Sequence, residues 1–218
     1  MRWIKRNGLE RRIERSLGRY PVTRLTGPRQ CGKTALARRL SRRLGGAYFD
    51  LEDPETPLQP ETARTVLVDL RGLVVVDEAQ RQPGLLPLLR VLADRRPLPA
   101  RFLILGSASP DLVRGASESL AGRVSYVDMG GFLGAETGVD NWKRLWLRGG
   151  FPLAYLAGAN ERSHDWRMNF IQSLLEHDLP QLGIRVPAAA LRRFWMMLAH
   201  YHGQVWNSAD LARSMGVK

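Results

Sequence analysis

The sequence predicts a doubly wound α/β domain with a parallel sheet, followed by a helical region. Short apolar strands alternate with helical segments as far as residue 130, the pattern of successive strand–helix–strand units. The runs at 73–76 and 102–105 are continuously apolar, which is typical of strands buried on both faces of a parallel sheet. Beyond Gly131 the apolar spacing becomes helical, and five of the six tryptophans follow residue 140.

Periodicity and helix-breaking residues define the individual elements. Apolar residues recur every four positions in the first two helices, as Leu9 and Ile13 and as Leu36 and Leu40. The proline-rich stretch at 53–60 predicts a loop. We expect strands at 22–26, 48–51, 73–76, 102–105 and 124–127, and helices at 9–17, 35–44, 62–70 and 85–93.

The net charge of +12 is concentrated in the first fifth of the chain. Residues 1–45 contain 14 Lys and Arg against 2 Asp and Glu, whereas residues 46–218 contain 19 of each. One interpretation is contact with nucleic-acid phosphates or another acidic partner. The other is a solvated helical arm that covers the sheet, and both stay open at this point.

Cysteine count and hydropathy exclude several classes of protein. A single cysteine, Cys31, excludes an intramolecular disulfide and a cysteine-based zinc site. No apolar stretch approaches the roughly 20 residues that cross a bilayer. Residues 1–19 are charged and lack the apolar segment of a signal peptide. We therefore expect a cytoplasmic protein without a membrane partner.

A glycine-bearing turn between a predicted strand and a predicted helix fits the pattern G-x-x-x-x-G-K-[ST] without a mismatch. Its residues are Gly27, Pro28, Arg29, Gln30, Cys31, Gly32, Lys33 and Thr34. Glycine permits the curled backbone whose N–H groups surround a phosphate, and the following helix N-terminus adds positive partial charge. Lys33 is expected to contact the β- and γ-phosphates of ATP, and the Thr34 hydroxyl to ligate Mg²⁺. A purely structural turn is the alternative.

Two adjacent carboxylates end the apolar strand at 73–76. Asp77, at the carboxyl end of this buried strand, is positioned to reach the Mg²⁺ that Thr34 holds. Glu78 is placed to polarise a water molecule against the γ-phosphate. Because the pair follows the phosphate loop by about 45 residues, we expect a metal role for Asp77 and a catalytic role for Glu78.

Two further candidates are Ser107 and Arg123. If the sheet places the strand at 102–105 between the two motif strands, Ser107 would bond the γ-phosphate or the attacking water. The alternative for Ser107 is a turn or a helix cap. Arg123, just before the fifth strand, is a candidate arginine finger for a neighbouring molecule's γ-phosphate. Its alternative is a surface ion pair with Glu118.

Six segments together resemble a family of bacterial and archaeal AAA+ ATPases. They are residues 27–34, 48–52, 76–81, 105–110, 117–123 and 147–152. The members are predicted ATPases with an N-terminal AAA+ core and a C-terminal domain of unknown function, which begins as a winged helix and continues as a nuclease-like region. The resemblance implies a P-loop NTPase core of five parallel strands, a helical lid, and self-association into a homo-oligomer. It assigns no biological process.

The predicted regions are a basic helical arm at 1–20, a P-loop AAA+ core at 21–131, a helical lid at 132–180, and an incomplete winged-helix start at 181–218. By analogy with related ATPases that carry Gly-x-Pro in the lid, Gly150 and Pro152 lie near the adenine. A simple helix break at these residues is the alternative.

Residues 207–217 look like the first half of a helix-turn-helix. Asn207 or Ser208 would cap the helix, and Gly216 suits the turn. Since the chain stops at Lys218, where a second helix should begin, we expect a truncated unit that does not by itself read DNA sequence. An ordinary C-terminal helix is the alternative.

These observations favour Mg²⁺-dependent ATP binding and hydrolysis, with the energy coupled to a partner that the sequence does not identify. A nucleotide-dependent switch with little turnover is the second hypothesis, and a fragment that binds ATP without assembling is the third. A kinase is a weaker alternative, because Asp77 and Glu78 suit water activation better than transfer to a substrate hydroxyl.

Overall fold

The computed structural model describes residues 3–106 and 120–216. The chain divides into two compact units, Met1–His164 and Asp165–Lys218, and each unit is described by itself. Within the described residues, no helix is both long enough and apolar enough to cross a membrane.

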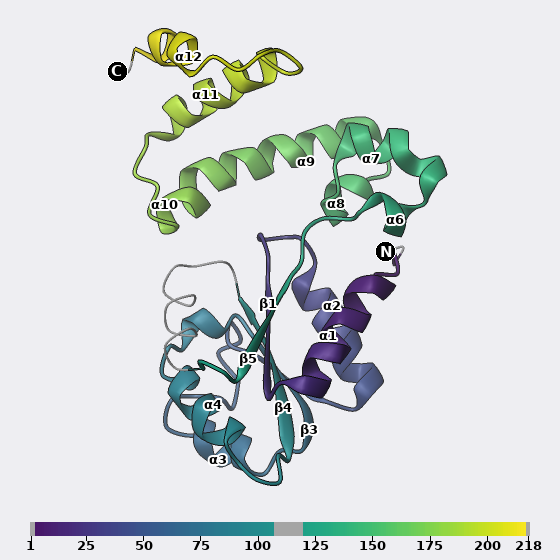
Figure 1. Ribbon diagram of the computed structural model, residues 1–218, viewed down its shortest axis with the longest axis vertical. Coiled ribbons are helices and arrows are strands. Elements are labelled where there is room, and N and C mark those ends of the chain that lie inside the picture. The colour runs from purple at the N-terminus through teal and green to yellow at the C-terminus, as the bar shows by residue number, and fades with distance from the viewer. Residues whose placement is uncertain (1–2, 107–119, 217–218) are drawn as a thin grey trace. The chain divides into compact units, whose positions relative to one another are not determined.

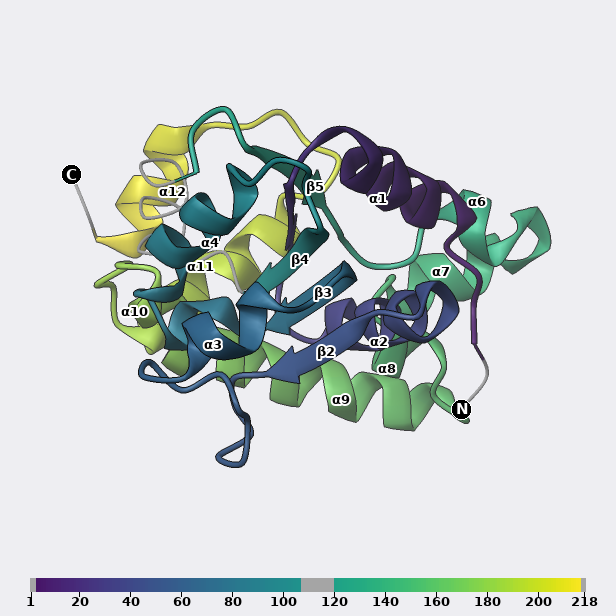
Figure 2. The same ribbon diagram turned by 90° about the horizontal axis from the view of Figure 1, so that it is seen from below.

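A five-stranded sheet lies at the centre of the first unit (Figures 1 and 2). Its strands run in the order β2-β3-β4-β1-β5, and every neighbouring pair is parallel. The strands are β1 (Val22–Thr26), β2 (Ala47–Asp50), β3 (Gly72–Asp77), β4 (Ala100–Gly106) and β5 (Val124–Asp128). The predicted α/β fold with a parallel sheet of five strands is therefore confirmed.

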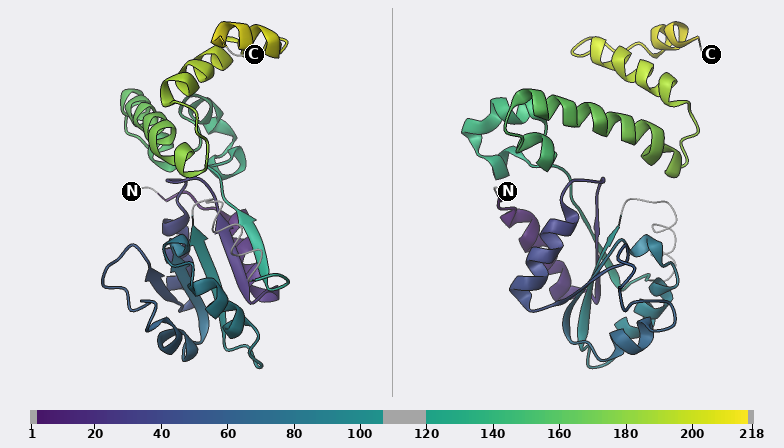
Figure 3. Two further views of the ribbon diagram at one scale, coloured as in Figure 1. Left: turned by 90° about the vertical axis from the view of Figure 1, so that its left-hand side faces the viewer. Right: turned by 180° about the vertical axis from the view of Figure 1, so that it is seen from behind.

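Helices cover both faces of this sheet, as Figure 3 shows. Helices α1 (Asn7–Arg19) and α2 (Lys33–Leu44) pack on one face, where their buried leucines meet Leu73 and Val75 of β3. Helices α3 (Ala63–Val68) and α4 (Leu85–Ala93) pack on the other face against Val74 and Val76. Successive residues of a strand point to opposite faces, so a continuously apolar strand supplies both layers of the core.

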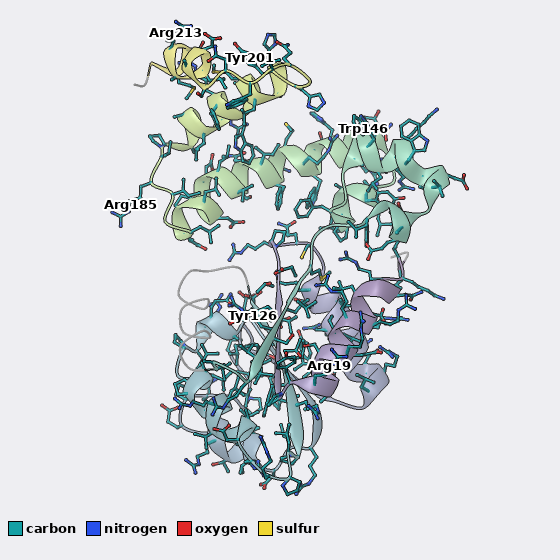
Figure 4. All side chains as sticks on the ribbon, in the orientation of Figure 1. Arg19, Tyr126, Trp146, Arg185, Tyr201 and Arg213 are labelled. Atoms are coloured by element: carbon teal, nitrogen blue, oxygen red, sulfur yellow. The ribbon has the colours of Figure 1, made fainter. Side chains whose placement is uncertain are left out.

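The basic arm is part of the folded core. The apolar side of α1 is buried against the sheet through Leu9, Ile13 and Leu17. Its outward side carries exposed arginines, among them Arg19, which is labelled in Figure 4. The arm therefore does cover the sheet, as one of the two interpretations expected, while its exposed side remains open to a partner.

Short helices follow β5 in the first unit. They are α6 (Gly134–Thr137), the 3₁₀ turn η2 (Val139–Asn141), α7 (Trp142–Arg148) and α8 (Pro152–Tyr155). Earlier in the chain, a further 3₁₀ turn, η1 (Ala79–Arg81), follows β3. Buried Arg148 ties the end of α7 to the start of α9 (Asn160–Ser173), because its Nη2 donates to the Asn160 side-chain oxygen at 2.7 Å. Trp146 on α7, labelled in Figure 4, is 80% exposed.

Among its described residues, the second unit consists of helices joined by turns and short irregular segments. It continues from α9 through the π-helical turn η3 (Leu174–Asp178), α10 (Leu179–Gln181), α11 (Ala188–His200) and α12 (Ser208–Met215). Asn207 caps α12, since its side-chain oxygen accepts the Ala209 N–H at 3.0 Å, and left-handed Gly216 ends the helix. Of the two predicted caps, the structure therefore uses Asn207.

Candidate nucleotide site

The predicted phosphate loop joins β1 to α2 at the carboxyl edge of the sheet. A Cβ on Gly27 would lie 2.0 Å from the Met129 carbonyl oxygen, so this position has no room for a side chain. Gly32 has a φ of 97°, which glycine adopts without steric cost. Gln30 has a φ of 61°, a conformation that is uncommon for a residue with a Cβ. The backbone therefore curls as phosphate loops require.

Lys33 is buried under this loop. Its ammonium nitrogen, Nζ, donates to the carbonyl oxygens of Gly27 and Pro28, each at 2.9 Å. The positive charge is thus held inside the curl of the loop, where it can attract a phosphate. Thr34 follows as the second residue of α2, so its hydroxyl lies at the helix N-terminus beside the loop.

Asp77 is buried at the end of β3 and holds two hydrogen bonds. Its carboxylate accepts the Tyr48 hydroxyl at 2.6 Å and the Glu78 N–H at 3.0 Å. Burial and the bond to Asp77 both raise the pKa of Tyr48, so the phenol stays protonated and donates to the carboxylate. Tyr48 thereby fixes the orientation of the predicted metal ligand.

Glu78 has left-handed backbone with a φ of 53° and accepts a hydrogen bond from the Gln80 side-chain amide. Within residues 3–106 and 120–216, Gln30 and Glu78 are the two residues other than glycine with positive φ. Strained backbone costs stability and persists only where the surrounding structure enforces it, and such residues cluster at functional sites. Gln30 belongs to the predicted phosphate loop, and Glu78 belongs to the predicted pair of carboxylates at the end of β3.

Strand β4 lies between β1 and β3, as the Ser107 hypothesis requires. Thr26, the last residue of β1, is in register with Gly106 at the end of β4. Ser107 itself lies outside the described residues, so its predicted role is untested.

Arg123 lies at the amino edge of the sheet, opposite the phosphate loop. Its carbonyl oxygen accepts the Val22 N–H at 3.2 Å, at the start of β1. Its guanidinium forms a two-pronged ion pair with Asp94, at 2.6 Å and 2.9 Å, which lowers the pKa of that carboxyl. The predicted surface partner, Glu118, lies outside the described residues. Its position places Arg123 away from the phosphate loop of its own chain. The pair with Asp94 matches the surface ion-pair alternative in kind, and the role in a neighbouring molecule stays a prediction.

A small apolar cavity of about 130 Å³ lies beside the phosphate loop. Its lining comes from the N-terminal segment, α2, the end of β5 and α8: Trp3, Ile4, Arg6, Cys31, Gly32, Ala35, Leu36, Met129, Phe132, Pro152 and Leu156. The Pro152 Cγ lies 3.6 Å from the position that a Cβ on Gly32 would occupy. Pro152 is thus next to the loop, as the lid analogy requires.

The two glycines before Pro152 have structural roles. Gly149 ends α7 with a φ of 73°. Gly150 packs directly on the backbone of Phe132, whose N–H donates to the Gly150 oxygen at 2.6 Å, and a Cβ on Gly150 would lie 2.5 Å from the Phe132 oxygen. Gly149 thus fits the helix-break interpretation, Gly150 is required by close packing on Phe132, and Pro152 lines the cavity.

Cys31 is buried within the loop. Burial raises the pKa of its thiol, and the nearby Lys33 ammonium only partly opposes that effect. Because the thiolate is the reactive form, this environment opposes the heightened reactivity that a position near Lys33 and a helix N-terminus suggests.

Sequence reasoning missed four contributors to this edge of the sheet, which are Tyr48, Gln80, Trp3 and Arg6. Tyr48 is a polar residue on β2, which pairs with β3, and it is in register with Val75. A prediction that these two strands are neighbours would have placed Tyr48 near Asp77. Trp3 and Arg6 precede the first helix and carry no motif, so only the folded chain places them beside the loop.

The donor set fits Mg²⁺ bound together with a nucleotide. Among the described residues, no cluster of three or more His, Cys, Asp or Glu could hold a metal by itself. Mg²⁺ in nucleotide sites is typically bound by one or two carboxylates together with phosphate oxygens and waters. A buried carboxylate at Asp77 and the Thr34 hydroxyl are the kind of protein ligands such a site uses.

The fold and this loop define a P-loop NTPase. The chain belongs to the AAA domain family, whose sequence profile matches residues 19–137, and residues 139–218 match a domain of unknown function. These matches confirm the predicted resemblance, in which an AAA domain is followed by a domain of unknown function.

Two mycobacterial proteins and one archaeal structure are similar to this chain. It is 52% identical over 214 residues to the uncharacterized proteins Rv2008c of Mycobacterium tuberculosis and Mb2031c of Mycobacterium bovis. The match covers 98% of this chain and 48% of each relative, so the chain spans about half of their length. A Walker-type ATPase of Pyrococcus abyssi shares the fold, with a TM-score of 0.63 and 19% identity over 98% of this chain and 90% of that one.

Proposed function

We propose that this chain binds ATP with Mg²⁺ and hydrolyses it to ADP and phosphate. The observation that carries the proposal is the placement of two motifs at one edge of one sheet. The phosphate loop follows β1, Asp77 ends β3, and the single strand β4 lies between them. In parallel α/β sheets, ligands bind at the carboxyl ends of the strands, where the strand order reverses.

In this proposal the loop N–H groups and Lys33 bind the phosphates. Thr34 and Asp77 hold Mg²⁺, which when bound neutralises charge on the phosphate oxygens. The apolar cavity beside Gly32 receives the adenine, with Pro152 and Trp3 at its walls. Its lining offers apolar contact with a flat base, and ligand pockets are typically lined by apolar and aromatic side chains.

Glu78 is the proposed general base. Its carboxylate would accept a proton from a water whose oxygen attacks the γ-phosphorus, while the bond from that phosphorus to the ADP oxygen breaks. The Gln80 amide that holds Glu78 would fix where the carboxylate points between turnovers.

The direct test compares Mg²⁺-dependent phosphate release and nucleotide affinity in wild type and Glu78→Gln. We expect turnover to fall by at least about 100-fold while ATP affinity stays within a few fold, since general-base catalysis contributes about 10²–10⁴. Glu55→Gln, a change at an exposed loop carboxylate, is the matched control. Equal turnover in Glu78→Gln and wild type would contradict the role, and binding without turnover in either protein would support a nucleotide-dependent switch instead.

We further propose that Arg123 acts on the nucleotide of a second copy of the chain. Its position at the amino edge, away from its own phosphate loop, supports a role in trans. If so, specific activity rises with protein concentration, and Arg123→Ala abolishes the rise. Asp94→Ala breaks the same ion pair without removing the arginine and should preserve it. A rise that survives in Arg123→Ala would overturn this part of the proposal.

A further inference from the structure

A basic groove of about 620 Å³ lies between α1 and the segment that leads from β5 into α6. Its cationic lining comes from one helix and the residues just before it: Lys5, Arg6, Arg11, Arg12 and Arg15. We propose that this groove binds the phosphate backbone of a nucleic-acid strand without reading its sequence. The inference goes beyond ATP binding and does not depend on it.

Three of the four arginines of α2 have acidic partners, whereas the exposed arginines with which α1 lines the groove have none among the described residues. On α2, Arg38 pairs with Asp50, and Arg43 pairs with Glu10 and Glu14 of α1. Within the described part of the chain, Arg11, Arg12 and Arg15 are exposed and form no ion pair. Their charge is therefore available to an external anion.

The acidic residues of the groove are already engaged. Glu136 accepts two hydrogen bonds from the Arg6 guanidinium, at 2.9 Å and 3.1 Å. Asp128 accepts the Thr26 hydroxyl at 2.5 Å. Because a hydroxyl does not neutralise a carboxylate, Asp128 keeps its negative charge, and Lys5 with the three free arginines outnumbers it four to one among the described lining residues.

The groove is also preformed. The buried Arg6 guanidinium donates to the carbonyl oxygens of Gly130 and Gly131, each at 3.0 Å, and lies 5.5 Å from the centre of the Phe132 ring. These bonds tie the start of α1 to the opposite wall. A ligand therefore does not need to order the two walls as it binds, which lowers the entropic cost of binding.

Spacing and chemistry favour nucleic acid over an acidic protein. Arg11 and Arg15 are four residues apart, so their positions on the helix are separated by a rise of about 6 Å. Guanidinium groups at such spacing suit repeated phosphates along a strand. Protein partners instead use buried aromatic and aliphatic anchors, and the lining of this groove carries one large exposed apolar side chain, Leu133.

The test is fluorescence anisotropy of labelled single-stranded and duplex oligonucleotides of two unrelated sequences, titrated with the whole chain. If four cations contact phosphates, the logarithm of affinity falls against the logarithm of salt with a slope of about −3. Both sequences should bind equally within a few fold, and the single-strand and duplex arms decide which form the groove prefers.

The variant Arg12→Gln with Arg15→Gln should weaken binding at least about tenfold at 50 mM salt and make the slope shallower by about 1.5. The control, Arg64→Gln with Arg71→Gln, removes equal charge from exposed arginines near α3 and should match wild type. Undetectable binding at low salt, equal loss in both double variants, or binding of polyglutamate but not of oligonucleotide would each overturn the proposal.

Discussion

The two faces of the sheet and its carboxyl edge are built from different kinds of residues. The faces are mainly apolar, with Leu89 and Phe102 almost wholly buried, although β1 also buries Arg24. The edge holds buried charge at Lys33 and Asp77, and strained backbone at Glu78. A core gains stability from apolar burial, whereas buried charge and strain cost stability and persist where they serve a ligand. Substitutions in the two regions should therefore separate stability from function.

The largest expected effect is on the face that α4 covers. Leu89→Ala should lower the free energy of unfolding by about 2–5 kcal/mol, because it removes a fully buried side chain and leaves a cavity. Val91→Ala, on the same helix but 56% exposed, should change it by less than about 0.5 kcal/mol. Urea denaturation measures both. If Leu89→Ala weakens ATP binding to the folded fraction, the two regions are not separable.

Next in size is the loss of a proposed metal ligand at the edge. Thr34→Ala should lower Mg²⁺-dependent turnover by about 100-fold, since metal coordination contributes several kcal/mol to the transition state. Thr34→Ser keeps the hydroxyl and should retain activity within a few fold. The two variants should unfold at similar urea concentrations. Equal activity in Thr34→Ala and Thr34→Ser would show that the hydroxyl has no such role.

The smallest effect concerns the hydrogen bond that orients Asp77. Tyr48→Phe removes one hydroxyl worth about 1 kcal/mol, so kcat should fall about 3- to 10-fold. The Mg²⁺ concentration for half-maximal rate should also rise, which a purely structural role would not cause. Tyr126→Phe, at a half-exposed site on β5, is the control. An unchanged Mg²⁺ requirement in Tyr48→Phe would contradict the positioning role.

The same comparison explains how much the sequence alone could predict. The elements of the core were predictable because burial on two faces leaves a periodic signature, and α4 matches its predicted range of 85–93 at both ends. Helix α2 begins at Lys33, two residues before its predicted start, because the helix opens within the phosphate loop itself.

The placement of the two motifs at one edge of the sheet was predictable, because phosphate chemistry restricts the residue types and spacing in such motifs, and the roles of their residues stay a prediction. Tyr48 and the cavity lining were not predictable, since their roles depend on which strands and segments become neighbours. The same is true of Arg6, whose charge suggests a solvent-exposed arm although it is buried and tied to Glu136. The local pattern of residues in the sequence contains no information about such long-range contacts.

The central claim is that the carboxyl edge is a site for ATP, and the binding of a fluorescent ATP analogue tests it most directly. Lys33→Ala should weaken binding about 10- to 100-fold, because it removes a charged hydrogen bond to phosphate. Lys143→Ala, at an exposed lysine of α7, should bind as wild type does. Equal affinity in all three folded proteins, or no binding by wild type, would contradict the account.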